Sequence, residues 1–426
     1  MTRTISLFLV LGLTPVASAD SLKGRRPNVI LIMCDDMGYS DIGCYGGEVS
    51  TPNLNRLAKE GLRFTQFYNN AKCTTTRASI LTGLYPRPGL LNKRMVTVGE
   101  VMKQAGYQTS LSGKWHLGSR KPKRPIDRGF DEYYGLLDGC CNFFNPAKRD
   151  PPFKGRRQRV FAHNAKRITE FPEDYYTTNA FTDHAIRTMK RFHAKKKPFF
   201  LHICYTAPHY PLHAKPEDIK KYKGKYLKGW NELRKTRHAR QLKMGLLNPK
   251  WKLSGDDSRS RDWSKARQEY EDLRMAVYAA MIDSMDQNIG RLMKALKEVG
   301  AGKDTLVMFL SDNGGCAEEP EGRKCSDPPG PKDFYTSVGP SWGWAQNTPF
   351  RRYKSWVHEG GISTPLIVWW PSIVKADTMT HQVGHIIDIL PTLVELGGKA
   401  YPKKYAGNEI LPVEGRGRQP TLEGEG

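Results

Sequence analysis

Short apolar runs alternate with helix-forming stretches along most of the chain. Five runs rich in apolar and β-branched residues, each bounded by polar or turn residues, predict strands buried within a sheet. The predicted strands span residues 28–34, 107–112, 198–205, 305–310 and 364–370.

Helices are predicted between these strands from their capping signals. Thr51-Pro52 places a capping residue and a proline at a helix start, and Gly61 ends that helix. Thr97 with Glu100 forms a capping box, which predicts a helix that stops at Gly106. Further helices are predicted near residue 73, over 266–299 and over 385–396.

This alternation predicts an α/β fold, with a mainly parallel central sheet flanked by helices on both faces. In such sheets ligands bind beyond the carboxyl ends of the strands. Polar residues follow four of the predicted strands, and we expect them to meet at one edge of the sheet. They are Asp35, Asp36, Lys114, His116, His209, Asp312 and Asn313.

The first 19 residues have the pattern of a signal peptide. Arg3 precedes an apolar stretch over 5–16, which is too short to span a bilayer, and Ala17-Ser18-Ala19 matches a cleavage site. No other apolar run is long enough to span a membrane, so no transmembrane segment is expected. The sequence therefore predicts a periplasmic or secreted protein.

Charge adds a prediction about partners. The 426 residues contain 67 Lys and Arg against 43 Asp and Glu, a formal net charge of +24. Such an excess attracts anionic partners: nucleic acid, an anionic surface or a polyanionic substrate. Export and the lack of a recognition-helix motif argue against nucleic acid. Two basic stretches, 148–159 and 215–252 (the latter within an insertion over about 214–255), are interpreted as solvated surface or as a basic rim around a site.

Eight cysteines are too few for a disulfide scaffold in a chain of this length. No C-x-x-C pair occurs, which argues against a zinc ribbon. Cys316 and Cys325 are close enough in sequence for a local bridge, and free thiols are the alternative.

The strand-end oxygens indicate a metal site. Asp35 and Asp36 are adjacent carboxylates that repel each other unless a cation holds them, and Asp312-Asn313 offers a second oxygen pair. Four oxygen ligands suit Ca²⁺, or Mg²⁺, better than Zn²⁺. A common turn is the alternative for Asp312-Asn313 taken alone.

Cys73 begins a predicted helix, and Arg77 lies one turn later on the same face. The positive end of the helix dipole favours a thiolate there. An ordinary, partly buried cysteine is the alternative.

The segment CTTTRASILTG at 73–83 resembles the signature of the type I, formylglycine-dependent sulfatases. Six further motifs match in family order, so that the resemblance covers roughly residues 27–415. They are NVILIMCDDMGYSDIGCYGG, GKWHLG, RGFDEYYG, YTAPHYPLH, SDNGG and Lys354 with Glu359-Gly360-Gly361.

This resemblance implies the alkaline-phosphatase-like fold and a sulfuric ester hydrolase. It implies that a formylglycine-generating enzyme converts Cys73 to the nucleophile and that a divalent cation, usually Ca²⁺, is bound. The implied metal ligands are Asp35, Asp36, Cys73, Asp312 and Asn313. The implied catalytic and substrate-binding residues are Cys73, Arg77, Lys114, His116, His209, His213 and Lys354.

Two features depart from the family pattern. Position 75 is Thr where the signature usually has Pro, and we expect the small antiparallel C-terminal subdomain of the family to be largely absent. We therefore expect a catalytic domain over 20–415 and a truncated tail over 416–426. The favoured substrate is a sulfated carbohydrate, with an aryl sulfate ester as a generic one. The alternatives are a phosphate or phosphonate ester hydrolase and a non-catalytic protein that binds sulfated glycans.

Overall fold

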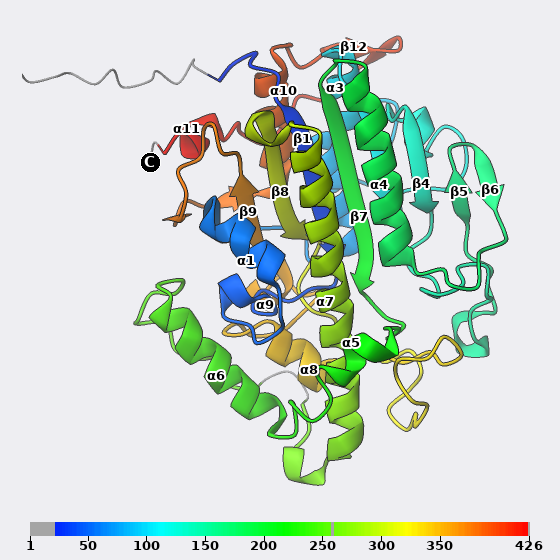
Figure 1. The fold of residues 1–426 in the computed structure, drawn as a ribbon, viewed down its shortest axis with the longest axis vertical. Helices are drawn as coiled ribbons and strands as arrows, with labels where there is room; N and C mark the ends of the chain where they lie inside the picture. The colour runs from blue at the N-terminus through cyan, green and yellow to red at the C-terminus, as the bar shows by residue number, and fades with distance from the viewer. Residues whose placement is uncertain (1–21, 257–259, 425–426) are drawn as a thin grey trace, which may run out of the picture.

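A mixed, mostly parallel sheet of 11 strands forms the centre of the protein (Figure 1). The computed structural model describes residues 22–256 and 260–424, so the predicted signal peptide lies outside the described residues. The strands follow the order β10-β2-β9-β8-β1-β7-β3-β4-β5-β6, and β11 also pairs with β2. The predicted α/β fold is confirmed.

The strands of this sheet are β1 Asn28–Asp35, β2 Leu62–Tyr68, β3 Gln108–Gly113, β4 Glu132–Leu136, β5 Phe161–His163, β6 Lys166–Ile168, β7 Phe199–Pro208, β8 Thr305–Ser311, β9 Ser363–Trp369, β10 Thr378–Thr380 and β11 Gly384–His385. A separate hairpin consists of β12 Lys404–Tyr405 and β13 Asn408–Glu409. The five predicted strands correspond to β1, β3, β7, β8 and β9, and their ends agree within three residues.

The parallel part of the sheet is β8-β1-β7-β3-β4. Strand β9 runs antiparallel to both β8 and β2, and β5 runs antiparallel to β4. The carboxyl ends of β1, β3, β7 and β8 therefore meet at one edge. In Figure 1, β7 and β8 point toward the lower end of the molecule, where α5, α6 and α8 gather.

The helices are α1 Pro52–Lys59, α2 Cys73–Thr82, α3 Val98–Gln104, α4 Thr177–Ala194, α5 Pro216–Lys220, α6 Gly229–Lys243, α7 Gln268–Glu298, α8 Gly339–Gln346, α9 Glu359–Ile362, α10 Ile389–Gly397 and α11 Gln419–Leu422. The predicted helices correspond to α1, α2, α3, α7 and α10, and the Thr97–Glu100 capping box is present. Helix α4 and strand β2 were not predicted. None of the helices in the described part of the chain is long and apolar enough to cross a membrane.

Alternate side chains of β1 face opposite sides of the sheet. Ile30 and Ile32 join the core under α4 and α7, which lie across the front of the sheet in Figure 1. Val29, Leu31 and Met33 join the core that includes α2, α3 and α10. Burying each such side chain contributes about 1.5–3 kcal/mol, which holds the strand ends in fixed positions.

The segment after α10 is bonded to the rest of the domain. The guanidinium of Arg418 pairs with Asp388 Oδ2 at 2.5 Å, and Leu411 N–H donates to the Arg94 carbonyl. Cys316 and Cys325 are both free thiols, so the local bridge is not formed in this structure.

Candidate active site

The ends of four parallel strands bring the predicted residues together. Asp35 is the last residue of β1, and the register places it beside Pro208 at the end of β7. Asp312 follows β8, and Lys114 follows β3. These side chains lie in the interior, and none is more than 1% exposed. The expected convergence at one edge is confirmed.

Two side-chain oxygens in this cluster have no hydrogen-bond partner. They are Asp35 Oδ1 and Asn313 Oδ1. The Asn313 amide donates to Asp36 Oδ1 at 2.7 Å, which leaves its own carbonyl oxygen unused. Buried, unpartnered oxygens beside several carboxylates are the donor set that a hard divalent cation requires. Asp35, Asp312 and Cys73 also have ligand atoms that all lie within 4.8 Å of one another. The residues therefore fit a divalent cation.

Arg77 and Lys114 hold two of the carboxylates. Arg77 donates from Nε and Nη2 to Asp312 Oδ2 at 3.0 and 2.8 Å. Lys114 Nζ donates to Asp35 Oδ2 at 2.5 Å. Burial and the neighbouring Asp312 raise the pKa of Asp35, and Lys114 opposes this shift. The cluster thus holds carboxylates whose mutual repulsion a further cation relieves.

A second group of charges surrounds Asp36. Lys354 Nζ donates to Asp36 Oδ2 at 2.9 Å and lies 3.4 Å from His209 Nε2. His209 Nδ1–H donates to the Tyr210 carbonyl at 2.6 Å, so Nε2 carries the lone pair that faces Lys354. Burial lowers the pKa of His209 to about 3, although Asp36 opposes the shift. The Lys354 ammonium and the neutral His209 imidazole therefore both point toward Asp36 Oδ2.

Cys73 is the first residue of α2 and is 4% exposed. Burial raises the pKa of its thiol, against the lowering effects of Lys114 and Lys354. Desolvation thus opposes the thiolate that the helix dipole and the two ammonium groups favour.

His116 lies beside Cys73, with Nδ1 3.4 Å from the Cys73 sulfur. Its backbone is left-handed, with φ of 62°, and this turns the ring toward α2 after the end of β3. Burial, Lys114 and Arg77 together move the pKa of His116 far below its usual value. The imidazole is thus neutral in the free protein, because burial and the neighbouring cations disfavour its protonated form.

Comparison with known proteins shows which family has this arrangement of residues. A family model described as Sulfatase matches residues 27–399. The chain belongs to the sulfatase family. It is a sulfuric ester hydrolase, and of the three functions left open by the sequence this is the one that the comparisons support.

Named relatives cover most of this sulfatase. The arylsulfatase of Klebsiella aerogenes is 33% identical and aligns with 97% of this chain and 95% of its own. The N-acetylgalactosamine-6-sulfatase of Rattus norvegicus is 28% identical over 94% of this chain and 69% of its own. Among solved structures, Ps i-CgsB in complex with k-i-k-neocarrahexaose is 26% identical, has a TM-score of 0.65, and covers 94% of this chain and 77% of that one.

His213 was predicted to bind substrate, and its geometry does not support this. Its Nδ1 accepts from the Phe143 amide at 3.3 Å, and its Nε2–H donates to the Phe334 carbonyl at 2.8 Å. The side chain is 1% exposed. Because both ring nitrogens are engaged by the backbone, His213 joins two loops beside the site.

Sequence reasoning missed Gly139, which lies against the His116 ring. A Cβ at this glycine would lie 2.5 Å from His116 Cε1 and 2.6 Å from Nε2. Glycine at position 139 therefore allows the His116 ring to keep its present position. The position stands three residues after β4, and no spacing rule within the sequence marks it.

The basic stretch over 215–252 was interpreted as solvated surface or as a basic rim, but one of its arginines lies in the interior. Arg237 of α6 is fully buried and pairs with Asp41 at 2.7 Å and Glu48 at 2.8 Å. Asp41 in turn accepts from the Tyr278 hydroxyl, which also donates to the Asp36 carbonyl at 3.1 Å. This part of the insertion therefore supports the loop that carries Asp35 and Asp36.

Proposed function

We propose that this sulfatase acts on sulfated carbohydrate outside the cytoplasm, through a formylglycine made from Cys73 and a bound Ca²⁺. The observation that carries the proposal is the position of Cys73. Its sulfur lies 3.4 Å from a neutral His116, within a buried shell of carboxylates and fixed cations.

Formylglycine hydrate supplies an oxygen nucleophile, and the calcium ion supplies positive charge at the anionic ester. The other requirements are met by residues of the chain. Arg77, Lys114 and Lys354 present positive charge toward a sulfate without needing to reorganise, because buried carboxylates hold them in position. Lys354 also lies where it is able to donate a proton to a leaving oxygen, and His116 is able to accept one.

The formylglycine proposal is tested by mass spectrometry of the protein purified from its own host. Trypsin cleaves after Lys72 and Arg77, which isolates the five residues of interest. We expect the mass of the aldehyde at position 73 and loss of turnover in Cys73→Ala. A peptide that carries only the thiol, in protein that is fully active, would overturn the proposal.

Thr75 provides a matched control. It lies in the first turn of α2, where Pro removes no intrahelical hydrogen bond. We expect Thr75→Pro, which restores the usual signature, to keep or raise the fraction of converted protein, whereas Cys73→Ala abolishes conversion.

The calcium proposal rests on the unpartnered Asp35 and Asn313 oxygens. We expect a chelator to abolish turnover and lower the melting temperature, and Ca²⁺ to restore both more effectively than Mg²⁺. Full activity after exhaustive chelation, with no metal found by elemental analysis, would contradict it.

The carbohydrate proposal rests on the loop over 148–159. Lys154 Nζ lies 5.4 Å from the centre of the Tyr210 ring, next to His209, and Phe153 is 49% exposed. Phe153 packs edge-on against Tyr335, which in turn contacts Tyr210. An exposed aromatic face beside an ammonium suits a sugar ring that carries sulfate. The names of the rat relative and of the solved neighbour, which refer to a sugar sulfatase and a hexaose, agree with this class.

We expect Lys154→Ala to lower kcat/KM for a sulfated oligosaccharide about 10-fold, the size of one lost cation contact. Turnover of an aryl sulfate should fall less, because such a substrate has no sugar ring for Phe153 and Lys154 to bind. Lys166→Ala, on exposed strand β6, is the control. Equal losses on both substrates would contradict the assignment of this loop to sugar binding.

A further inference from the structure

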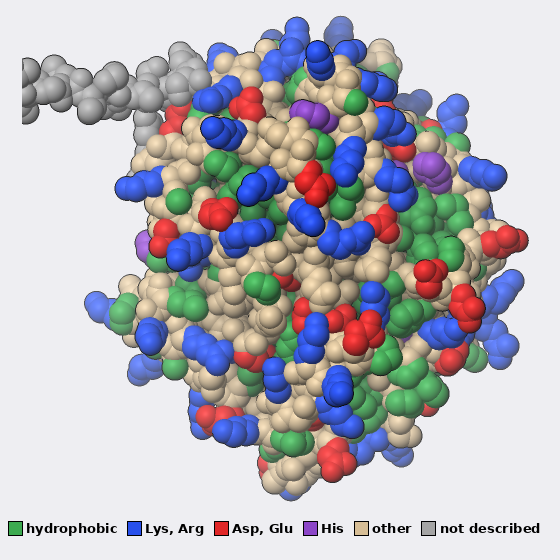
Figure 2. Space-filling view, in the orientation of Figure 1, with side chains coloured by type: hydrophobic (Ala, Val, Ile, Leu, Met, Phe, Trp, Pro, Cys, Tyr) green, Lys and Arg blue, Asp and Glu red, His purple; other side chains and the backbone are tan. Residues whose placement is uncertain are grey.

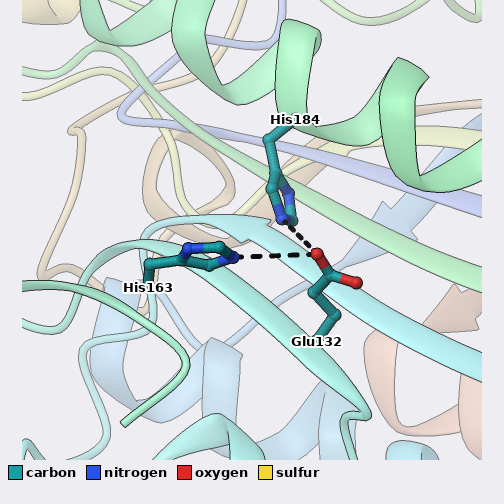
Figure 3. Close-up of side chains that lie close together, drawn as sticks. All are labelled: Glu132, His163 and His184. Carbon is teal, nitrogen blue, oxygen red and sulfur yellow. Dashed lines mark ion pairs between the residues drawn. The ribbon is translucent and has the colours of Figure 1, made fainter. Parts of the chain in front are cut away.

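Two histidines and a glutamate form a cluster that the active site does not use (Figure 3). Glu132 begins β4, His163 ends β5 and His184 lies in α4. The cluster lies on the side of the sheet that α4 covers, where β4, β5 and β6 form the sheet edge (Figure 1).

The separations in this cluster differ from those of hydrogen bonds. Glu132 Oε1 lies 3.5 Å from His184 Nε2 and 3.7 Å from His163 Nε2, and the three atoms all lie within 4.8 Å of one another. Ordinary N–H···O bonds measure about 2.7–3.2 Å. Two ligands of a tetrahedral zinc ion, each bound at about 2.0–2.1 Å, are separated by about 3.3 Å. The spacing thus resembles that of a ligand set more than that of a hydrogen-bonded group.

His184 adds a second observation. Its side chain is 4% exposed, and its Nε2 has no hydrogen-bond partner. Its Nδ1 lies 2.7 Å from the Ser112 hydroxyl oxygen. When Nδ1–H donates to Ser112, the lone pair of Nε2 faces a carboxylate oxygen, which is unfavourable without a cation between them.

The surroundings hold all three side chains in place. The other carboxylate oxygen of Glu132 pairs with the Arg191 guanidinium, which leaves Oε1 directed at the two rings. The Tyr134 ring stacks on His184 at 5.3 Å and meets His163 edge-on. His163 is 51% exposed, so an ion reaches the cluster directly from solvent.

We propose that Glu132, His163 and His184 bind one divalent cation of the zinc class, with the fourth position open to water. Two imidazoles and one carboxylate suit Zn²⁺, whereas the active-site oxygens suit Ca²⁺. The ion links β4, β5 and α4. Ser112 and Arg191 orient two of its ligands from outside.

The experiment measures zinc binding to the metal-stripped full-length protein, with Ca²⁺ kept in excess to occupy the active-site oxygens. Titration against a chromogenic chelator gives the affinity, and Co²⁺ in place of Zn²⁺ gives an absorption spectrum that reports ligand type and geometry. The exposed His163→Ala is the main variant because it removes no core packing, and Glu132→Gln is the second. His193→Ala, a histidine on the same helix outside the cluster, is the matched control.

We expect one equivalent of zinc, a tetrahedral Co²⁺ spectrum without thiolate absorption, and a melting temperature that rises with Zn²⁺. His163→Ala and Glu132→Gln should weaken binding about 100-fold or more, whereas His193→Ala binds as the wild type does. Turnover in His163→Ala should be unchanged. Zinc binding that is equal in the wild type and His163→Ala, a Co²⁺–thiolate band, or no binding at all would each overturn the proposal.

Discussion

At the residue scale, the active site depends on buried charges that are each fixed by one or two partners. Asp312 receives two hydrogen bonds from Arg77, and Asp36 receives one from Lys354. Separating such a buried pair leaves one charge without compensation, at a cost of about 3–5 kcal/mol. A substitution that separates one of these pairs therefore lowers the stability of the site strongly.

Gly139 gives the sharpest prediction at this scale. In Gly139→Ala the new Cβ would overlap the His116 ring, so the ring must move. We expect kcat for an aryl sulfate to fall about 100-fold, as for other misplacements of about 1 Å. The melting temperature should change little.

Gly255→Ala is the control, because a Cβ at that position meets nothing within 4 Å. Wild-type kcat in Gly139→Ala would show that the His116 ring does not need its present position.

At the scale of elements, strand periodicity accounts for the strands that were predicted correctly. Of the five predicted helices only α3 has a side-chain cap, and Thr51 makes no capping hydrogen bond at the start of α1. Helix α3 begins at its capping box because Thr97 and Glu100 satisfy each other's backbone groups, a purely local effect. Helix α4 was missed because Tyr176, which precedes it, makes no side-chain cap. Its position is decided instead by packing against β7 and α7.

Helix α6 gives a prediction about stability. In Arg237→Gln the carboxylates of Asp41 and Glu48 lose their partner in the interior. We expect the free energy of unfolding to fall by about 3–5 kcal/mol in urea denaturation. Calcium affinity should also fall, because Asp41 and Tyr278 hold the loop that carries Asp36.

Arg240→Gln, an exposed arginine of the same helix, removes an equal charge without a buried partner and should leave stability within about 0.5 kcal/mol of the wild type. Equal effects of the two variants would show that α6 acts through net charge alone.

At the scale of the whole molecule, the charge of +24 is widely distributed. Figure 2 shows Lys and Arg side chains across the visible face rather than gathered in one patch. Some of the lysines and arginines in the two basic stretches are also paired internally, as Lys221 is with Asp218 and Asp283. The net charge therefore marks no single binding patch on the visible face.

Buried histidines predict how the stability of the molecule depends on pH. Burial lowers the pKa of both His202 and His213 to about 4, from 6.5. The unfolded chain therefore takes up protons first as the pH falls, so stability is full above about pH 6.5 and declines toward pH 4. Each group contributes on the order of 3 kcal/mol to this decline.

Urea denaturation between pH 7 and pH 5 measures the slope. His202→Gln, which keeps a donor for the Leu31 carbonyl, should flatten it, and the surface variant His193→Gln should not. An unchanged slope in His202→Gln would show that other groups control acid unfolding.

The sequence by itself determined the local features of this protein. The runs that form β1, β7 and β8 are too apolar to lie anywhere but in a buried sheet, and their polar ends mark the site. The motifs around Cys73 and Lys354 identified the family. These signals are carried by neighbouring residues, so they can be read without knowing the fold.

Only the tertiary structure decided which of those residues are buried and which of them contact one another. Burial raised the pKa of the Cys73 thiol, and backbone groups bond both ring nitrogens of His213. Packing placed Gly139 against His116 and brought Glu132 to two distant histidines. Desolvation and contact across the sheet depend on residues far apart in the chain, and no pattern of neighbouring positions encodes them.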